Sequence, residues 1–159
     1  MSLTDKLREA GFKPSQNTDG EFKPYTGTYK VETKVLRPDV DDKGQKFYQA
    51  EWNIIETLEG MPKRDSKYSA FRKRYFIDDP DKGLDNLKKL LNDFFTIGVE
   101  LDQSSDEAFE ESFKSAIGSQ GYIRGWEWTP DGKDRAQQSF VIQKAQVAEK
   151  KRSTQSLPF

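Results

Sequence analysis

Alternation of apolar and charged residues in the first half of the chain restricts its fold more than any other feature. Beginning at Thr28, core-type and charged side chains take turns: Tyr29, Val31, Thr33 and Val35 alternate with Lys30, Glu32 and Lys34. Successive side chains of a β-strand point to opposite faces, so this pattern predicts a strand with one buried face. Similar alternation recurs at about residues 46–57 and 68–77, on either side of a break at Gly60-Met61-Pro62. The sequence therefore predicts three consecutive β-strands.

The third of these strands has an unusual polar face. Phe71, Tyr75 and Ile77 fall on one side of it, and Arg72 and Arg74 fall on the other, beside Tyr68 and Phe76. We expect the first side to pack in the core. The second side is expected to be cationic and aromatic.

Beyond the third strand the apolar period changes to that of a helix. Apolar residues at steps of three and four predict an amphipathic helix over residues 81–96: Leu84, Leu87, Leu90, Leu91, Phe94 and Phe95. Pro80 suits the start of this helix. Ser104 followed by Glu107 resembles a capping box, which predicts a second, short helix to about Ala116.

Two further strands are expected after the helices, at residues 121–128 and 136–147. Three strands, a helical insertion and two more strands is the order of the five-stranded OB barrel. We therefore predict a mainly β protein, with a five-stranded OB-type barrel and a helical insertion between strands 3 and 4, over residues 27–148. Residues 1–26 are expected to form an N-terminal arm with a short helix and a linker, and residues 149–159 a flexible C-terminal tail.

Two residue types, cysteine and histidine, are missing from the 159-residue chain. Their absence removes disulfides, thiolate nucleophiles, imidazole bases and the usual soft metal ligands, so we expect neither an enzyme nor a cofactor. Hydrophobic residues make up only 33% of the chain but aromatic residues 13%, so large rings are expected to build much of the core. No apolar run is long enough to span a bilayer or serve as a signal peptide, which predicts a cytoplasmic protein without membrane contact.

Carboxylates are the remaining source of catalytic chemistry. Two groups of aspartates stand close together in the sequence: Asp39, Asp41 and Asp42, and Asp78, Asp79 and Asp81. Roles in turns and helix caps explain both groups without a metal. The alternative is a nuclease that uses the second group and cleaves single-stranded DNA when magnesium is present.

The fourth strand is expected to combine rings and a cation on one face, which Tyr122, Arg124, Trp126 and Trp128 share. Rings stack on unpaired bases and arginine neutralises phosphates, so this mixture favours binding of a single-stranded nucleic acid. Alternatively, the tryptophans belong to the core and Arg124 lies at the barrel rim with its aliphatic stem buried.

The charged residues are segregated along the chain, although the net charge is only −1. Residues 63–74 contain six Lys or Arg and one acid, a net charge of +5, whereas residues 100–111 contain six acids and no Lys or Arg. Such a dipolar molecule can bind a polyanion through one side. The simpler interpretation is that both runs are solvated surface.

Several segments resemble those of the small OB-fold single-stranded DNA-binding proteins that bacteriophages encode in their replication and recombination modules. These segments are Gly27-Thr28-Tyr29-Lys30-Val31, Phe47-Tyr48-Gln49-Ala50-Glu51-Trp52, the leucine-rich stretch from Leu84 to Leu91, and Gly121-Tyr122-Ile123-Arg124-Gly125-Trp126. The resemblance covers about residues 27–147. It implies sequence-independent binding of single-stranded DNA in phage replication and recombination, in the cytoplasm of the bacterial host.

The end of the chain, Leu157-Pro158-Phe159, is similar to the Pro-Phe terminus of bacterial single-stranded DNA-binding proteins. In that family the terminus recruits replication and repair partners, so the similarity implies a partner site for phage or host proteins here. The acidic residues that precede the terminus in that family are missing, and Ser153-Thr154-Gln155-Ser156 stand in their place.

We expect the DNA to be held by phosphate neutralisation and by base stacking, the latter at roughly 1 to 3 kcal/mol per ring. The expected phosphate contacts are Lys34, Arg37, Arg72, Arg74 and Arg124, and the expected stacking residues are Tyr122, Trp126 and Trp128. Trp52 is expected in the core, because Ala50 and Ile54 share its face. The alternative function is a phage protein-interaction module, in which the same barrel recruits replication or recombination enzymes. A homo-oligomer is compatible with either function.

Overall fold

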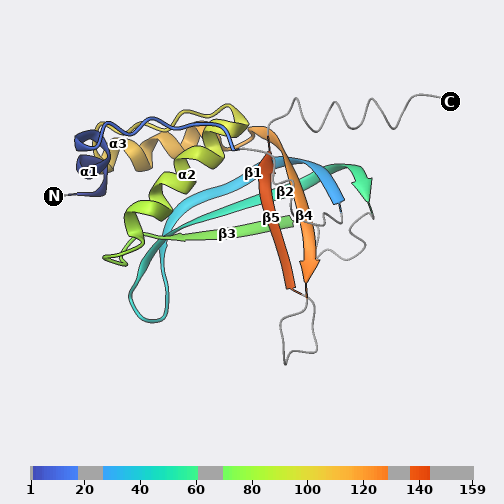
Figure 1. Cartoon of the computed structure of the whole chain (residues 1–159), viewed down its shortest axis with the longest axis horizontal. Helices are drawn as coiled ribbons and strands as arrows, with labels where there is room; N and C mark the ends of the chain where they lie inside the picture. The colour runs from blue at the N-terminus through green and yellow to red at the C-terminus, as the bar shows by residue number, and fades with distance from the viewer. Residues whose placement is uncertain (1, 18–26, 61–69, 129–136, 144–159) are drawn as a thin grey trace.

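The structure, a computed structural model, describes residues 2–17, 27–60, 70–128 and 137–143 (Figure 1). Over these residues the chain is mainly β, and five antiparallel strands form one sheet in the order β3-β2-β1-β4-β5. The strands are β1 (Gly27–Val40), β2 (Lys46–Gly60), β3 (Ala70–Phe76), β4 (Gln120–Trp128) and β5 (Gln137–Gln143). The helices are α1 (Leu3–Glu9), α2 (Gly83–Ile97), α3 (Asp106–Glu111) and the 3₁₀ helix η2 (Ser112–Ala116).

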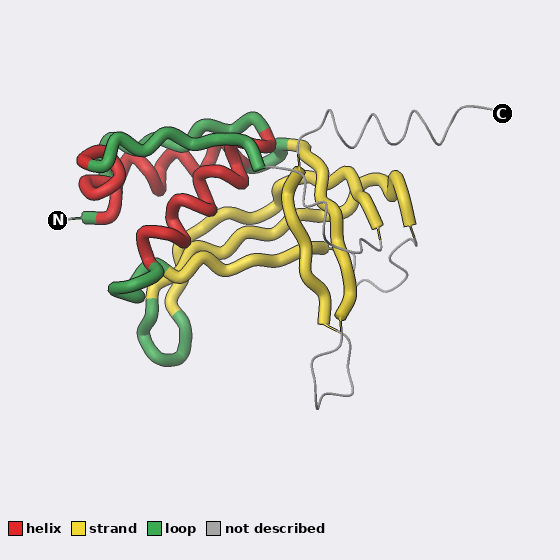
Figure 2. Tube along the Cα trace, viewed as in Figure 1, coloured by secondary structure: helices red, strands yellow, loops and turns green. Residues whose placement is uncertain are grey.

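The sheet is strongly curled into a half-barrel. Figure 2 shows β4 and β5 running steeply across the direction of β2 and β3, with the helices gathered at one side of the sheet. β1 joins the two parts, because it pairs with β2 along its whole length and with β4 over residues 27–32. Three register shifts interrupt the pairing of β1 with β2, and such irregularities bend the strands that carry them.

The core lies between the inner face of the sheet and α2. Trp52 is fully buried, and its ring stacks on that of Phe94 in α2 with 5.8 Å between the centroids. Phe140 of β5 contacts both Trp52 and Phe71 of β3, at centroid distances of 5.9 and 4.9 Å. Aromatic side chains therefore fill the space between β3 and β5, the two edge strands of the sheet. The predictions that Trp52 is a core residue and that large rings build the core are confirmed.

α2 buries the apolar side that the sequence predicts. Its buried leucines and phenylalanine are Leu87, Leu90, Leu91 and Phe94. The helix ends at Gly98, where a φ of 99° suits glycine. It begins at Gly83, two residues later than predicted, because the preceding residues form a turn. In that turn the carboxylate of Asp79 accepts hydrogen bonds from the backbone N–H groups of Asp81 and Lys82.

The second helical segment is present as predicted, but its cap differs. The N-cap of α3 is Ser105, whose Oγ accepts a hydrogen bond from the backbone N–H of Ala108 at 3.0 Å. The predicted capping box of Ser104 and Glu107 is therefore wrong by one residue, because the N–H of Ser104 donates to Asp102 in the preceding turn. Within the described residues, none of the helices has the length and apolar character needed to cross a membrane.

The short N-terminal helix is also confirmed, and it packs against the rest of the structure. α1 starts with a capping box at Ser2 and lies beside α2 and α3 (Figure 1). Leu7 of α1 is fully buried in the core. Farther along, the side-chain amide of Asn17 donates to the carboxylate of Asp93 on α2 and to the carbonyl of Ile142 on β5. The N-terminal segment up to Asn17 is thus fastened to both the helical layer and the sheet.

Candidate nucleic-acid interface

The outer face of β1, β2 and β3 carries a row of exposed cations. Tyr48 and Trp52 of β2 are buried on the inner side, so the residues between them that alternate with the core positions point outward. In the sheet register, Gln49 lies between Arg37 of β1 and Arg74 of β3. We call this surface the basic face and define it by Arg37, Phe47, Gln49, Glu51, Arg72, Arg74 and Phe76.

Arg74 is held above an aromatic ring. Its guanidinium carbon lies 4.8 Å from the ring centroid of Phe47, and its Nε donates to Oε1 of Gln49 at 3.3 Å. Phe47 in turn contacts Phe76, with 5.1 Å between the ring centroids. A guanidinium has five N–H donors, so these contacts leave donors for a further partner. Arg74 is therefore an oriented cation on an exposed surface.

The other two arginines of the basic face form exposed ion pairs. Nη2 of Arg72 lies 3.2 Å from Glu51, and Nη2 of Arg37 lies 3.9 Å from Asp39; the arginine side chains are 53% and 65% exposed. Exposed pairs contribute only about 0–1 kcal/mol, so a phosphate can replace the carboxylate at little cost. Lys34, at a register shift of β1, is exposed as well.

Lys73 points to the opposite face from the two arginines beside it. Its Nζ lies 3.1 Å from Oδ2 of Asp93 and 4.9 Å from the ring centroid of Tyr75. The Tyr75 hydroxyl donates to the same carboxylate oxygen at 2.5 Å. Burial, followed by the charge of Asp93, raises the pKa of Tyr75 well above its ordinary value. Lys73 therefore stabilises the packing of α2 on β3. The part of the basic run before residue 70 lies outside the described residues.

Tyr122 and Arg124 do not lie on the exposed basic face. They point away from the core, because Ile123 between them is a core residue, yet they are only 7% and 6% exposed. Their cross-strand neighbours Thr28 and Gln143 are buried too. The expectation that Tyr122 and Arg124 form an open surface is therefore corrected. Alternation places both residues on the side away from the core, but it carries no information on what covers that side.

The remaining predicted site residues lie outside what the structure describes. Trp126 and Trp128 belong to β4 by their backbone pairing with β5, and the structure does not describe their side chains. Leu157, Pro158 and Phe159 lie outside the described residues. The contacts expected for these five residues stay predictions.

The aspartate clusters take part in turns. Oδ1 of Asp41 accepts a hydrogen bond from the backbone N–H of Lys43 at 2.9 Å, within the turn that joins β1 to β2. Hydrogen bonds from the backbone N–H groups of Asp81 and Lys82 lower the pKa of Asp79 below its ordinary value. Across residues 2–17, 27–60, 70–128 and 137–143, no group of three or more acidic side chains is arranged to hold a metal ion.

Two rings of the basic face, Phe47 and Phe76, were not among the predicted site residues. A signal for Phe47 exists in the sequence, because it precedes the core residue Tyr48 and must point to the opposite face. Its position beneath Arg74 follows from the register of β2 with β3, which alternation alone does not specify.

Comparison of the chain with protein-family models gives no match, and comparison with curated proteins gives no significantly similar sequence. Support for a function therefore comes from the residues of this chain and from their arrangement.

Proposed function

We propose that the chain binds single-stranded DNA without sequence preference and that the basic face is the contact surface. The observation that carries this proposal is the placement of Arg37, Arg72 and Arg74 on one exposed face of three neighbouring strands. Strand geometry separates the Cα atoms of Arg72 and Arg74 by about 7 Å and those of Arg37 and Arg74 by about 10 Å. A flexible strand with one charge per nucleotide can contact all three, and binding releases its condensed counterions.

The rings of the basic face favour an unpaired strand over a duplex. Phe76 is half-buried and lies against the buried ring of Phe47, which supports Arg74, so the ring of Phe76 and the cation of Arg74 share one surface. A base can stack on a protein ring when it is free of its partner base, and each such contact contributes about 1–3 kcal/mol whatever the base. We include Trp126 and Trp128 as further stacking residues on the sequence argument.

The proposal includes an OB-type fold in which the helices form an insertion between the third and fourth strands. The curled five-stranded sheet and the element order, with α2, α3 and η2 between β3 and β4, support this assignment. OB barrels bind oligonucleotides with the face of their second and third strands. The basic face lies largely on β2 and β3, which agrees with that mode of binding.

In this proposal the protein acts in phage replication and recombination, in the cytoplasm of the bacterial host, as the resemblance of its sequence segments implies. Its action is binding alone, and no catalytic group or cofactor takes part. Cations neutralise phosphates and rings hold bases, so the strand stays extended and accessible to other proteins.

Fluorescence anisotropy with a labelled oligothymidylate tests the proposal. We expect binding at low salt that weakens as salt rises, similar affinity for an unstructured oligonucleotide of mixed sequence, and weaker binding to a duplex of the same length. The absence of binding at low salt, or a clear preference for the duplex, would overturn the proposal.

A further inference from the structure

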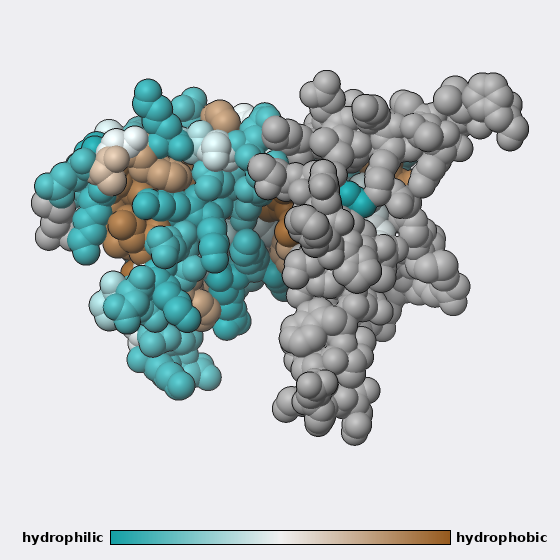
Figure 3. Space-filling model, viewed as in Figure 1, coloured by the Kyte–Doolittle hydropathy of each residue, from teal (hydrophilic) through white to brown (hydrophobic). Residues whose placement is uncertain are grey.

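A second surface feature lies apart from the basic face. A cleft with a volume of about 570 Å³ opens between α1, the N-terminal half of α2 and the ends of β2 and β3. Figure 3 shows an apolar patch in this region, between α1 and α2, with hydrophilic surface around it. The apolar residues that line the cleft are Leu3, Ile77, Pro80 and Leu84, with the buried Leu87 and Phe109 beneath them. The residues of β2 that line the cleft are Lys46 and Tyr48. They alternate with Phe47 along the strand and so face away from the basic face.

The rim of this cleft is acidic. Five aspartates and two lysines are among its lining residues: Asp78, Asp79, Asp81, Asp85, Asp106, Lys6 and Lys46. One of the lysines is already paired, because Nζ of Lys46 lies 2.8 Å from Oε2 of Glu110. The cleft therefore attracts positive charge and repels nucleic acid, which is the opposite of the basic face.

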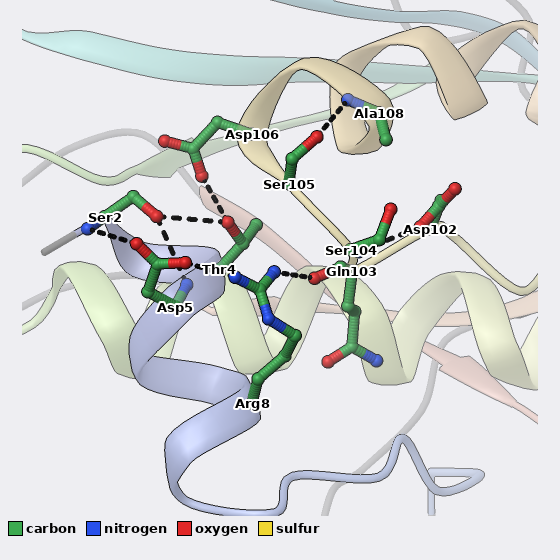
Figure 4. Close-up of polar contacts among 10 residues, drawn as sticks. All are labelled: Ser2, Thr4, Asp5, Arg8, Asp102, Gln103, Ser104, Ser105, Asp106 and Ala108. Carbon is green, nitrogen blue, oxygen red and sulfur yellow. Dashed lines mark hydrogen bonds and ion pairs between the residues drawn. The ribbon is translucent and has the colours of Figure 1, made fainter.

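The walls of the cleft are tied together before any ligand arrives. Thr4 of α1 donates from its hydroxyl to Oδ1 of Asp106 on α3 at 2.6 Å, and Nη1 of Arg8 donates to the backbone carbonyl of Gln103 (Figure 4). From β2, the hydroxyl of Tyr48 donates to Glu110 of α3 at 3.2 Å. A preformed site loses less conformational entropy on binding than one that must be ordered by its ligand.

We infer that this cleft is a docking site for a peptide segment of a partner protein, in which apolar side chains are flanked by Lys or Arg. The apolar side chains would contact the half-buried floor residues Leu84 and Ile77, and the cations would lie against Asp81 and Asp85 on the rim. The volume falls within the range of about 300–1,000 Å³ that is usual for ligand pockets. Because the basic face lies elsewhere, one molecule can hold DNA and a partner together, yet the docking site does not depend on DNA binding.

Three fluorescein-labelled synthetic peptides test this inference by anisotropy: Lys-Lys-Leu-Phe-Lys-Arg, Lys-Lys-Ser-Ser-Lys-Arg and Glu-Glu-Leu-Phe-Glu-Asp. The first is expected to bind, and the other two at least about tenfold more weakly, because one lacks the apolar side chains and the other is repelled by the rim. Equal binding of all three peptides, or no binding of the first at low salt, would refute the docking site.

Protein variants locate the binding. Asp81→Lys with Asp85→Lys reverses two exposed charges of the rim, and it should weaken binding of the first peptide at least about tenfold. Glu9→Lys with Glu100→Lys changes the net charge equally at exposed positions outside the cleft and should leave binding unchanged. Thermal melting shows whether each variant is folded.

Two-dimensional NMR of the unaltered protein gives a readout that needs no variant. Amide shifts on adding the first peptide should centre on residues 81–87 and on α1. The variant with Arg72→Ala and Arg74→Ala should bind the peptide as the unaltered protein does, whether or not the basic face binds DNA. Shifts confined to other parts of the chain, or equal loss in the rim variant and its control, would contradict the docking site.

Discussion

The guanidinium of Arg74 lies over the ring of Phe47, 4.8 Å from its centroid. The two residues come from neighbouring strands and are diagonal neighbours, since Arg74 is paired in register with Gln49 and Phe47 with Phe76. The partners that the structure describes for Arg74 are thus a ring and an amide, not a carboxylate. No ion pair with these partners has to be broken before Arg74 meets a phosphate.

Removing the ring beneath Arg74 should weaken DNA binding. Phe47→Leu keeps most of the buried volume, so the free energy of unfolding should fall by less than about 1.5 kcal/mol. The cation–π contact is worth about 0.5–1 kcal/mol at an exposed site, so we expect affinity for oligothymidylate to fall about two- to fivefold. Anisotropy titrations measure the change. Phe95→Leu on α2, which lies away from the basic face, is the control and should bind normally.

If Phe47→Leu binds as tightly as the unaltered protein, the ring does not orient Arg74 for binding. Weaker binding by both Phe47→Leu and Phe95→Leu would point to a loss of stability and not to the interface.

The N-terminal helix should contribute strongly to stability. Leu7 is fully buried in the core, and Leu→Ala substitutions at such positions cost about 2–5 kcal/mol of unfolding free energy. Urea denaturation of Leu7→Ala, followed by far-ultraviolet circular dichroism, measures this cost. DNA affinity at temperatures well below the melting transition should not change. A cost under about 1 kcal/mol would mean that α1 is peripheral to the core.

Stability should decrease at alkaline pH. Burial raises the pKa of both Tyr48 and Tyr75, and the nearby carboxylates Glu110 and Asp93 add to the effect. In the unfolded chain tyrosine ionises near pH 10, while the folded chain retains these two protons, so unfolding releases protons above that pH. The stabilisation is complete below about pH 10 and is lost as pH rises further, by up to about 1.4 kcal/mol per pH unit for each tyrosine.

Urea midpoints measured between about pH 8 and pH 11 follow this loss. Tyr75→Phe and Tyr48→Phe should each reduce the slope above about pH 10, because each removes one of the retained protons. A slope that stays the same in both variants would show that other groups cause the alkaline loss.

Alternation in the sequence was sufficient to assign the faces of β2 and β3. It correctly placed Trp52 in the core and Arg72 and Arg74 outside. Successive side chains of a strand point to opposite faces, so burial of one face produces a visible alternation in the sequence. It also predicted which side of α2 is buried, since Leu87 and Leu90 follow the helical period.

At the site, what alternation does not predict is decided by contacts between distant residues. Lys73 pairs with Asp93, twenty residues away and on α2, and neither residue signals this in the local pattern. Tyr122 and Arg124 point away from the core as predicted, but their burial is set by neighbours in β1 and β5. The pattern along one strand predicts the face on which a side chain lies, but it does not predict which residues of other strands cover that face.

The salt dependence of oligothymidylate binding tests the role of the basic face most directly. It should be compared for the unaltered protein, for Arg72→Ala with Arg74→Ala, and for Lys89→Ala with Lys114→Ala, which removes two exposed cations elsewhere. We predict that the arginine variant binds at least about tenfold more weakly at low salt, and that its slope of log K against log salt is shallower by about 1.4, or 0.7 for each lost phosphate contact. The lysine variant should keep the slope of the unaltered protein, whereas an arginine variant that keeps both affinity and slope would show that DNA does not bind to this face.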